Sequence, residues 1–442
     1  ESKTRVIDAW DKGKASVMIS LPTGAGKTIT FSSLLQDLTE NTNKRGLILV
    51  HRDSLLEQSI DKLNFVWPGV QTGKVKGRTK EYDKQITVGS IQTLTGCIQE
   101  FIESTKRYGN IDYVIIDEAH HSFAPTWRSV YDALRSTGKI KFLGVTATPI
   151  RTKKEENLAE IFEDAVFSIS IFQLIQEGFL SPLIGYNVQT SLSLDGVRIT
   201  KGDYNLKDLS GRVNTSNFNR QVVAVWREKA RDHKSICFAV DIDHVETLVE
   251  HFNAAGAKAV GIHGKLSIAE QRQIIQGFAD GKYNVLVNCQ LLTEGFDEPS
   301  IDCVLMARPT SSRALYVQIG GRGLRLYPGK KNCLLIDYTS NSQDNSMITM
   351  QDLLGFYGLK RAEEIYKKSS TSELALAESG PVPFEISPES IPSLMAVDTF
   401  GEEMFTSPAY QAIDVFDMNK FAWTELDGDY FVTARQSLAI GV

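Results

Sequence analysis

One segment of the chain joins a glycine-rich turn to a lysine and a threonine, a combination that can bind phosphate groups. The apolar stretch SVMISL leads into Pro22, Thr23, Gly24, Ala25, Gly26, Lys27 and Thr28, and a helix-compatible stretch follows. Glycines let backbone N–H groups face phosphates at a helix N-terminus, where Lys27 can neutralise them and the Thr28 hydroxyl can ligate Mg²⁺. Leu21 occupies the first position of the G-x-x-x-x-G-K-[ST] pattern, so a chance match in a loop is the alternative.

Two adjacent carboxylates follow a second apolar stretch, YVIIDEAHH, which contains Asp117 and Glu118. At the carboxyl end of a buried parallel strand, the two carboxylates of such a pair can take different catalytic roles. Asp117 can hold a Mg²⁺ ion, and Glu118 can orient and deprotonate an attacking water. A solvated acidic turn is the alternative, but it leaves the preceding strand and the phosphate-binding loop unexplained.

Short apolar runs alternate with longer mixed segments, which predicts parallel strands joined by crossover helices. The rhythm runs from Val17 to about Ala147 and resumes after about residue 181, so we expect an α/β fold with two successive sheets. The join is placed at Gly178–Leu183, where a helical pattern ends at glycine and proline follows. The predicted domains are 1–180, 181–345 and an accessory region, 346–442, with a linker and a small antiparallel unit around a D-G turn.

Composition is that of a globular protein. Hydrophobic residues make up 42% of the 442, which is enough for packed cores, and no uninterrupted apolar stretch is long enough to span a bilayer. The net charge of -6 argues against a protein that coats nucleic acid through its overall charge. Any nucleic-acid strand that it binds must therefore be held in a local groove. The five cysteines lack metal-ligand spacing and are expected to be buried thiols.

Four motifs occur in order between Ser16 and Tyr338: the glycine loop, DEAH, Val145–Pro149 and Gln318–Arg325. In order and approximate spacing they resemble the motifs of superfamily 2 helicases. The resemblance implies two tandem RecA-like P-loop domains, plus a small C-terminal accessory unit. It also implies ATP and Mg²⁺ as cofactors. An aromatic-Gln pair that reads adenine in related helicases is expected at or before Glu1, so adenine selectivity rests on the resemblance.

The resemblance also assigns roles to residues after the DEAH motif. Arg322 and Arg325 would be arginine fingers that reach the γ-phosphate from the second domain, where fixed guanidinium groups stabilise a spread-out negative charge. A surface loop with solvated arginines is the alternative. The motifs further imply a coupling role for Gln318, His120, Thr146 and Thr148, and an approach to the nucleotide ribose for Gly295 and Asp297.

Three segments are candidates for contacts with nucleic acid. They supply small hydroxyls, backbone N–H groups and a few basic side chains at strand ends, which suits phosphate contacts without base readout. Ordinary loop packing is the alternative for each. The candidate residues are Arg52, Gln58, Ser90, Gln92, His263, Gly264 and Lys265.

HRDSLLEQ, DEAHH and TEGFDEPSIDCVLMARPT resemble the UvsW-like phage helicases and the mitochondrial branch-migrating DNA helicases. This favours forked, branched or duplex DNA as substrate, with little sequence preference, over RNA. An RNA helicase and a non-catalytic nucleic-acid-binding scaffold remain alternatives. A basic run, Lys74–Lys84, could follow a duplex backbone, although a solvated loop is slightly favoured. Trp423 could stack on a base, although a core position is favoured.

No membrane partner is expected, and we expect the chain to function as a monomer. Its location is left open between the cytoplasm of a bacterial or phage-infected cell and the mitochondrial matrix.

Overall fold

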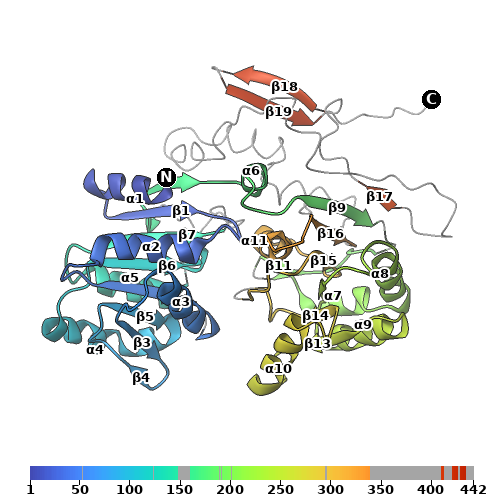
Figure 1. Cartoon of the computed structure of the whole chain (residues 1–442), viewed down its shortest axis with the longest axis horizontal. Helices are drawn as coiled ribbons and strands as arrows, with labels where there is room; N and C mark the ends of the chain where they lie inside the picture. The colour runs from blue at the N-terminus through green and yellow to red at the C-terminus, as the bar shows by residue number, and fades with distance from the viewer. Residues whose placement is uncertain are drawn as a thin grey trace. The chain divides into compact units, whose positions relative to one another are not determined.

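The computed structural model describes most of the chain. The described residues are 1–51, 53–122, 124–147, 160–188, 190, 192–200, 202–293, 296–338, 410–412, 421–426 and 429–434. They form two compact units that divide between Ser170 and Ile171, and each unit has its own large sheet (Figure 1). Helix α6 (Ile171–Gln176) therefore belongs to the second unit, although the sequence placed it before the hinge. Within the described ranges, no helix is long and apolar enough to cross a membrane.

The first unit is built on a sheet of eight strands in the order β4-β3-β5-β2-β6-β7-β1-β8. All neighbours in it are parallel except β3 and β4, which form an antiparallel hairpin. The strands are β1 (Ser16–Ser20), β2 (Gly46–Val50), β3 (Thr72–Lys76), β4 (Thr79–Lys80), β5 (Ile86–Ser90), β6 (Tyr113–Asp117), β7 (Lys141–Thr146) and β8 (Asp164–Ser168). The helices are α1 (Ser2–Asp11), α2 (Lys27–Thr39), α3 (Asp53–Val66), α4 (Ile91–Tyr108) and α5 (Pro125–Arg135), with a 3₁₀ turn η1 (Ala119–His121).

Helices cover both faces of this sheet because both faces are apolar. Val17 and Ile19 of β1 pack in one core cluster with residues of α1, α2 and α3, whereas Met18 packs in a second cluster with residues of α4 and α5. Alternate residues of a strand point to opposite faces, so a strand between two helical layers must be apolar throughout. This explains the continuous apolar runs of the sequence.

The second unit is built on a sheet of seven strands in the order β13-β14-β12-β15-β16-β9-β17. Its strands are β9 (Leu183–Val188), β12 (Ser235–Phe238), β13 (Ala259–Ile262), β14 (Val285–Asn288), β15 (Cys303–Met306), β16 (Cys333–Asp337) and β17 (Tyr410–Ala412). A short hairpin, β10 (Ile199–Thr200) and β11 (Asp203–Tyr204), lies outside this sheet. The helices are α6, α7 (Leu206–Val213), α8 (Ser216–Lys229), α9 (Ile242–Ala254), α10 (Ile268–Ala279) and α11 (Arg313–Gly320), with a 3₁₀ turn η3 (Gly321–Leu324).

The predicted fold class, α/β with two tandem RecA-like domains, is confirmed. The two apolar runs named above, SVMISL and YVIIDEAHH, form β1 and β6, and both pair in parallel with β7. The sequence did not predict the antiparallel edge strands β4 and β17. Strand β17 reaches β9 from far along the chain, and local patterning carries no signal for such a pairing.

Near the C-terminus, β18 (Phe421–Leu426) and β19 (Asp429–Ala434) pair antiparallel, on either side of the D-G dipeptide that predicted a turn. Trp423 lies in β18 opposite Val432, and its side chain lies outside the described structure. The linker predicted within 346–442 also lies outside it, so the accessory region stays a prediction.

Candidate functional site

The phosphate-binding loop connects β1 to α2 in the first unit. Gly24 and Gly26 have φ of 87° and 77°, in the left-handed region that favours glycine. A Cβ on Gly26 would meet no atom within 4 Å, so the backbone conformation, not crowding, favours glycine there. The backbone N–H of Leu21 donates to the Thr146 carbonyl (2.8 Å) and anchors the loop to β7. Thr23, Ala25, Lys27 and Thr28 lie in this loop and in the first turn of α2.

The lysine of this loop meets the DEAH carboxylate. Lys27 Nζ lies 3.3 Å from Glu118 Oε1, and the two side chains are only 12% and 13% exposed. Glu118 follows β6 with a φ of 49°, a conformation that a residue with a side chain rarely adopts and that is often found at functional sites. The Glu118 N–H donates to Asp117 Oδ1 (3.0 Å), which fixes the turn between the carboxylates. A phosphate group bound at the start of α2 would compete with Glu118 for the Lys27 ammonium.

A buried histidine connects this carboxylate to the next strand. His120 Nδ1 lies 3.3 Å from Glu118 Oε2 and 3.1 Å from Thr146 Oγ1. His120 and Thr146 are both buried, at the ends of β6 and β7. The structure therefore brings Lys27, Glu118, His120 and Thr146 into one chain of polar contacts, whereas Thr148 lies outside the described residues.

In the second unit, the two predicted arginine fingers are held by one neighbouring segment. Arg322 is 6% exposed, and its guanidinium donates to the carbonyls of Phe296 and Thr293, both at 2.6 Å. Arg325 donates to the Phe296 carbonyl (3.3 Å) and pairs with Asp297 Oδ1 at 2.7 Å. Burial lowers the pKa of Arg325, although the charge of Asp297 opposes the shift. Both side chains are thus fixed within their own unit.

Three other predicted residues of this unit, Gln318, Asp297 and Gly295, belong to the same two motifs. Gln318 of α11 is buried, and its Nε2 has no hydrogen-bond partner among the described residues. Such a buried donor is costly unless it finds an acceptor. Asp297 pairs with Arg325, and its predicted approach to a ribose stays a prediction. Gly295 lies outside the described residues.

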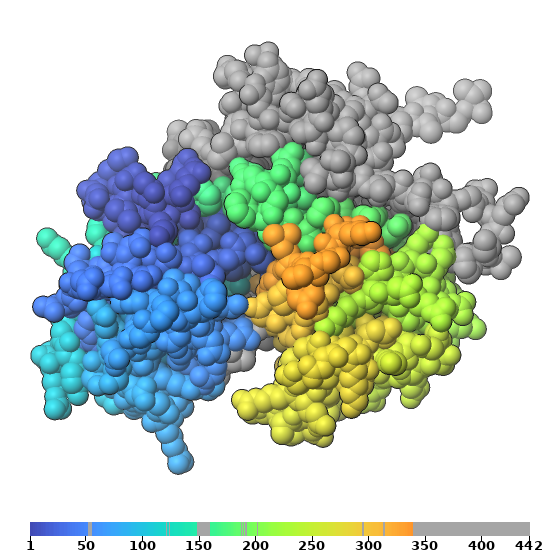
Figure 2. Space-filling model, viewed as in Figure 1, coloured from blue at the N-terminus to red at the C-terminus, as the bar shows by residue number. Residues whose placement is uncertain are grey.

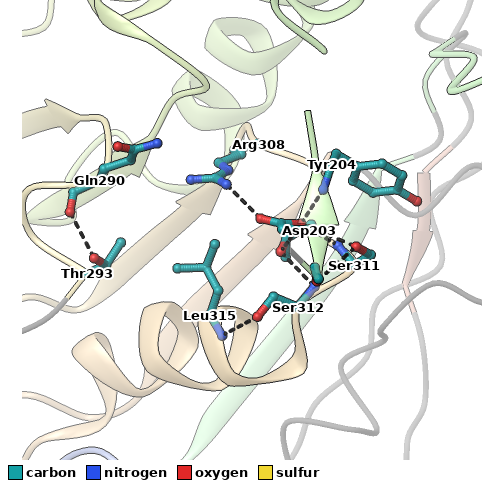
Figure 3. Close-up of polar contacts among 10 residues, drawn as sticks. Asp203, Tyr204, Gln290, Thr293, Arg308, Ser311, Ser312 and Leu315 are labelled. Carbon is teal, nitrogen blue, oxygen red and sulfur yellow. Dashed lines mark hydrogen bonds and ion pairs between the residues drawn. The ribbon is translucent and has the colours of Figure 1, made fainter. Parts of the chain in front are cut away.

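Helix α11 leads into residues 321–325, which carry Arg322 and Arg325 and are called the arginine loop below. The start of this helix is anchored by a carboxylate that the sequence did not indicate (Figure 3). Asp203 of β11 accepts from Arg308 Nη2 (2.7 Å), Thr310 Oγ1 (2.9 Å) and the Ser311 N–H (2.8 Å). Ser312 then caps α11 by accepting from the Leu315 N–H. Arg308 lies two residues after the end of β15, so its place near a strand's carboxyl end could have indicated it. Asp203 has no such local signal.

Thr293, whose carbonyl accepts from Arg322, is itself fixed. Its hydroxyl donates to the carbonyl of Gln290 (2.9 Å), a residue with a φ of 60° (Figure 3). Thr293, whose carbonyl is one of the two acceptors of Arg322, is therefore held by a hydrogen bond to the residues just after β14.

Most of the described candidates for nucleic-acid contacts lie at or just beyond the carboxyl ends of their strands, whereas Gln58 lies inside α3. Ser90 ends β5 and donates to Thr93 Oγ1 (3.0 Å), and Gln92 Nε2 donates to the His51 carbonyl (2.6 Å) after β2. Strands β2 and β5 are neighbours, so the segments that follow them meet at one edge of the sheet. After β13 in the second unit come His263, Gly264 and Lys265, of which the last two are exposed. Arg52 lies outside the described residues.

The basic run Lys74–Lys84 is largely a hairpin of two strands rather than a loop, although residues 77–81 are exposed, as the prediction of a solvated segment implied. It forms most of β3 and all of β4, whose hairpin projects from the first unit (Figures 1 and 2). The ammonium of Lys74 pairs with Glu57, and that of Lys80 pairs with Glu100. These carboxylates offset much of the positive charge, so the hairpin carries a weaker argument for duplex binding than its composition suggested.

Known families match both units. Residues 1–151 match the type III restriction enzyme res subunit family (ResIII), and residues 217–327 match the helicase conserved C-terminal domain (Helicase_C). A Saccharomyces cerevisiae protein named "Putative ATP-dependent helicase IRC3" is 31% identical over 85% of this chain. A Schizosaccharomyces pombe protein whose name describes a mitochondrial ATP-dependent helicase, irc3, is 28% identical over 84%. The chain spans 55% and 61% of the length of these two relatives.

Solved structures share the fold. The type ISP restriction-modification enzyme LlaBIII bound to DNA aligns with a TM-score of 0.57 and 17% identity, over 80% of this chain and 29% of that one. Saccharomyces cerevisiae Dbp5 bound to RNA and ADP BeF₃ aligns with a TM-score of 0.54 and 16% identity, over 83% of this chain and 92% of that one. At these identities the likeness concerns the fold alone. One fold is therefore found with DNA in one case and RNA in the other.

Proposed function

The chain is a member of helicase superfamily 2, with a ResIII and a Helicase_C domain, and we propose on that premise that it is a DNA helicase or translocase that uses ATP to unwind or branch-migrate forked or junction DNA. The observation that carries the proposal is the contact between Lys27 and Glu118. It places a phosphate-binding cation beside a carboxylate that can activate water, at the start of a helix.

In the proposed reaction, Lys27 and the N–H groups of the glycine loop bind the phosphates of ATP. Glu118 orients the attacking water and accepts its proton. Thr28 and Asp117 offer a hydroxyl and a carboxylate, the hard oxygen ligands that Mg²⁺ prefers, and would hold the ion. A bound Mg²⁺ would neutralise phosphate charge. Arg322 and Arg325 would then stabilise the charge that spreads over the transferred phosphoryl group.

Coupling to nucleic acid would run through the buried His120–Thr146 contact, with Gln318 and Thr148 in related roles. Because Thr146 ends β7 and its carbonyl also holds the phosphate-binding loop, a shift of this strand end reaches the ATP site directly. Nucleic acid would be gripped through phosphates by the segments after β2, β5 and β13, since these offer few groups for reading bases.

Two observations support DNA rather than RNA as the substrate. Motifs of the chain resemble those of the UvsW-like and branch-migrating DNA helicases, and the LlaBIII enzyme, which has the same fold, is bound to DNA. The RNA bound to Dbp5 keeps an RNA helicase as the second candidate. We further propose that the chain acts as a monomer. The word mitochondrial in the name of the S. pombe relative fits the matrix as one of the proposed locations.

The test is a panel of ATPase and unwinding assays with single-stranded, duplex, forked and four-way DNA and with structured RNA. All substrates are compared at one salt concentration, because salt sets the apparent affinity. The proposal predicts that forked or four-way DNA gives the largest stimulation of ATP hydrolysis and is unwound. If only RNA stimulated ATP hydrolysis, the chain would be an RNA helicase and the proposal would be wrong. No hydrolysis with any polynucleotide would leave the non-catalytic scaffold.

A further inference from the structure

A lysine outside the helicase motifs donates to four backbone carbonyls around the arginine loop. Lys330 Nζ lies 2.5 Å from the Ile301 carbonyl, 2.8 Å from that of Arg325 and 3.4 Å from that of Pro299, and it also donates to the Gly323 carbonyl. An ammonium has three N–H donors, so the more distant Pro299 carbonyl is the weakest of the four. The side chain of Lys330 thereby connects two separate segments.

These two segments are the ones that must be aligned. The first, 296–301, provides the Phe296 carbonyl and the Asp297 carboxylate that hold the arginine side chains. The second, 322–325, provides the arginines themselves. Lys330 bonds to carbonyls in both segments and so fixes the guanidinium groups and their acceptors relative to each other.

The arginine loop has further supports, which together leave it little freedom. The Ser181 N–H donates to the Leu324 carbonyl (2.7 Å), and the Ser181 hydroxyl donates to the Arg325 carbonyl (3.0 Å). Gly323 packs so closely on β15 and β16 that an added Cβ would collide with Cys333 Sγ. The consecutive carbonyls of Gly323, Leu324 and Arg325 thus all accept hydrogen bonds from Lys330 or Ser181.

The position of Lys330 has an energetic cost that points to a role. Burial lowers the pKa of its ammonium, because the charged form loses solvation there. The hydrogen bonds to the backbone carbonyls must compensate for this loss. A turn needs no buried cation to close, since the Lys330 N–H already bonds to the Tyr327 carbonyl (3.1 Å). What the ammonium adds is the alignment of 296–301 with 322–325.

We infer that Lys330 is a positioning residue for ATP hydrolysis, which sets Arg322 and Arg325 in the geometry that stabilises the transferred phosphoryl group. The inference rests on the proposed function. Lys330 contacts neither ATP nor nucleic acid in this account, so its loss should slow turnover and leave substrate binding in place. Misplacement of a catalytic group by about 1 Å can cost about 100-fold in rate.

The experiment compares three variants of the full chain with wild type. Lys330→Met keeps the unbranched stem and removes the ammonium, and Lys330→Arg keeps the charge and the N–H donors. Lys331→Met is the matched control, because its neighbouring side chain is exposed. With saturating forked DNA, we expect Lys330→Met to lower kcat about 10- to 100-fold while KM for ATP changes less than about threefold. Lys330→Arg should fall between Lys330→Met and wild type.

A purely structural lysine would give a different pattern. The rates are normalised to the folded fraction, measured by ATP binding and by urea unfolding, so that loss of folded protein does not count as loss of kcat. If Lys330→Met does not fold, Lys330→Arg and Ser181→Ala carry the test, each with an expected fall of about threefold or more in kcat. A normalised kcat equal to that of Lys331→Met would overturn the inference.

Failure of the inference and failure of the proposed function are distinguishable. Active wild type with inactive Arg325→Ala, and with Lys330→Met at the control rate, would overturn only the role of Lys330. Wild type without ATPase activity on any DNA or RNA would overturn both.

Discussion

Lys27 in the first unit is held differently from Arg322 and Lys330 in the second. In the first unit, Lys27 contacts a side chain, the carboxylate of Glu118. In the second unit, Arg322 and Lys330 donate to backbone carbonyls. A side chain can rotate away when a competing anion arrives, whereas a carbonyl in an ordered turn cannot. We therefore expect the first unit to rearrange its contacts when phosphate binds and the second to present cations already in place.

The largest effects on ATP turnover should come from substitutions in the Lys27–Glu118 pair of the first unit. Lys27→Ala removes the cation that binds phosphate, so we expect weak ATP binding and turnover below about one thousandth of wild type. Glu118→Gln keeps the shape and removes the base, so we expect ATP binding to persist while turnover falls about 100- to 10,000-fold. Nucleotide-binding titrations and steady-state ATPase assays measure both quantities.

Matched controls for these two variants are Lys139→Ala and Glu246→Gln, which change exposed residues of the same types. Both should behave as wild type. If Lys27→Ala and Glu118→Gln also kept wild-type turnover, the assignment of the site would be wrong.

Next in size are the effects of substituting Arg322 or Arg325, which should differ in stability but not in kcat. For the proposed role as an arginine finger, Arg325→Ala should lower kcat about 1,000-fold, with little change in stability, because its partner Asp297 is 34% exposed. Arg322→Ala should lower kcat similarly and also lower the free energy of unfolding by about 2 kcal/mol or more, since the Thr293 carbonyl loses the donor described for it and the Phe296 carbonyl keeps only the longer bond from Arg325. ATPase assays and urea unfolding of both variants test this. Equal stability of the two variants would contradict the carbonyl anchoring.

A smaller effect is expected at the connection between the ATP site and the sheet. Thr146→Val keeps the shape of a buried side chain and removes the hydroxyl that lies 3.1 Å from His120 Nδ1. We expect the ratio of DNA-stimulated to basal ATPase activity to fall about three- to tenfold. Thr137→Val, at an exposed position, is the control. A variant that loses basal activity and keeps its stimulation ratio would refute the coupling role.

The smallest effect concerns the response of the second unit to acid. His244 accepts from the Val240 N–H and contacts Asn219 Oδ1 at 3.0 Å, and burial lowers its pKa from 6.5 to about 4. Below pH 6.5 the His244 imidazole binds a proton in the unfolded chain but stays neutral in the folded unit. The free energy of unfolding therefore decreases as pH falls from 6.5 toward 4, by up to about 1.4 kcal/mol per pH unit.

Urea unfolding across this pH range, with wild type and His244→Gln compared, isolates that contribution. The variant should be less stable near pH 7 and should lose less stability on acidification. Parallel curves would mean that His244 does not titrate as its burial implies.

The sequence predicted those parts of the molecule that depend on local patterns. Continuous apolar runs indicated the parallel strands, and the glycine loop and DEAH motif indicated where Lys27 and Glu118 would lie. The contact between these two residues follows because their strands, β1 and β6, both flank β7 and so end at one edge of the sheet.

Contacts between distant segments could not be predicted in the same way. Asp203 reaches Arg308 from a hairpin more than a hundred residues away, and the ammonium of Lys330 reaches the Ile301 carbonyl, 29 residues before it in the chain. Backbone carbonyls have no sequence signature, so cations that they hold are visible only in the fold.

We propose that residues of both units act on one triphosphate. The direct measurement is the trapping of ADP with aluminium fluoride, which mimics the transferred phosphoryl group, in the presence of forked DNA. The account predicts that wild type traps one ADP per chain, and that Arg325→Ala binds ATP normally yet fails to trap. An Arg325→Ala chain that trapped ADP as fully and as durably as wild type would contradict the claim.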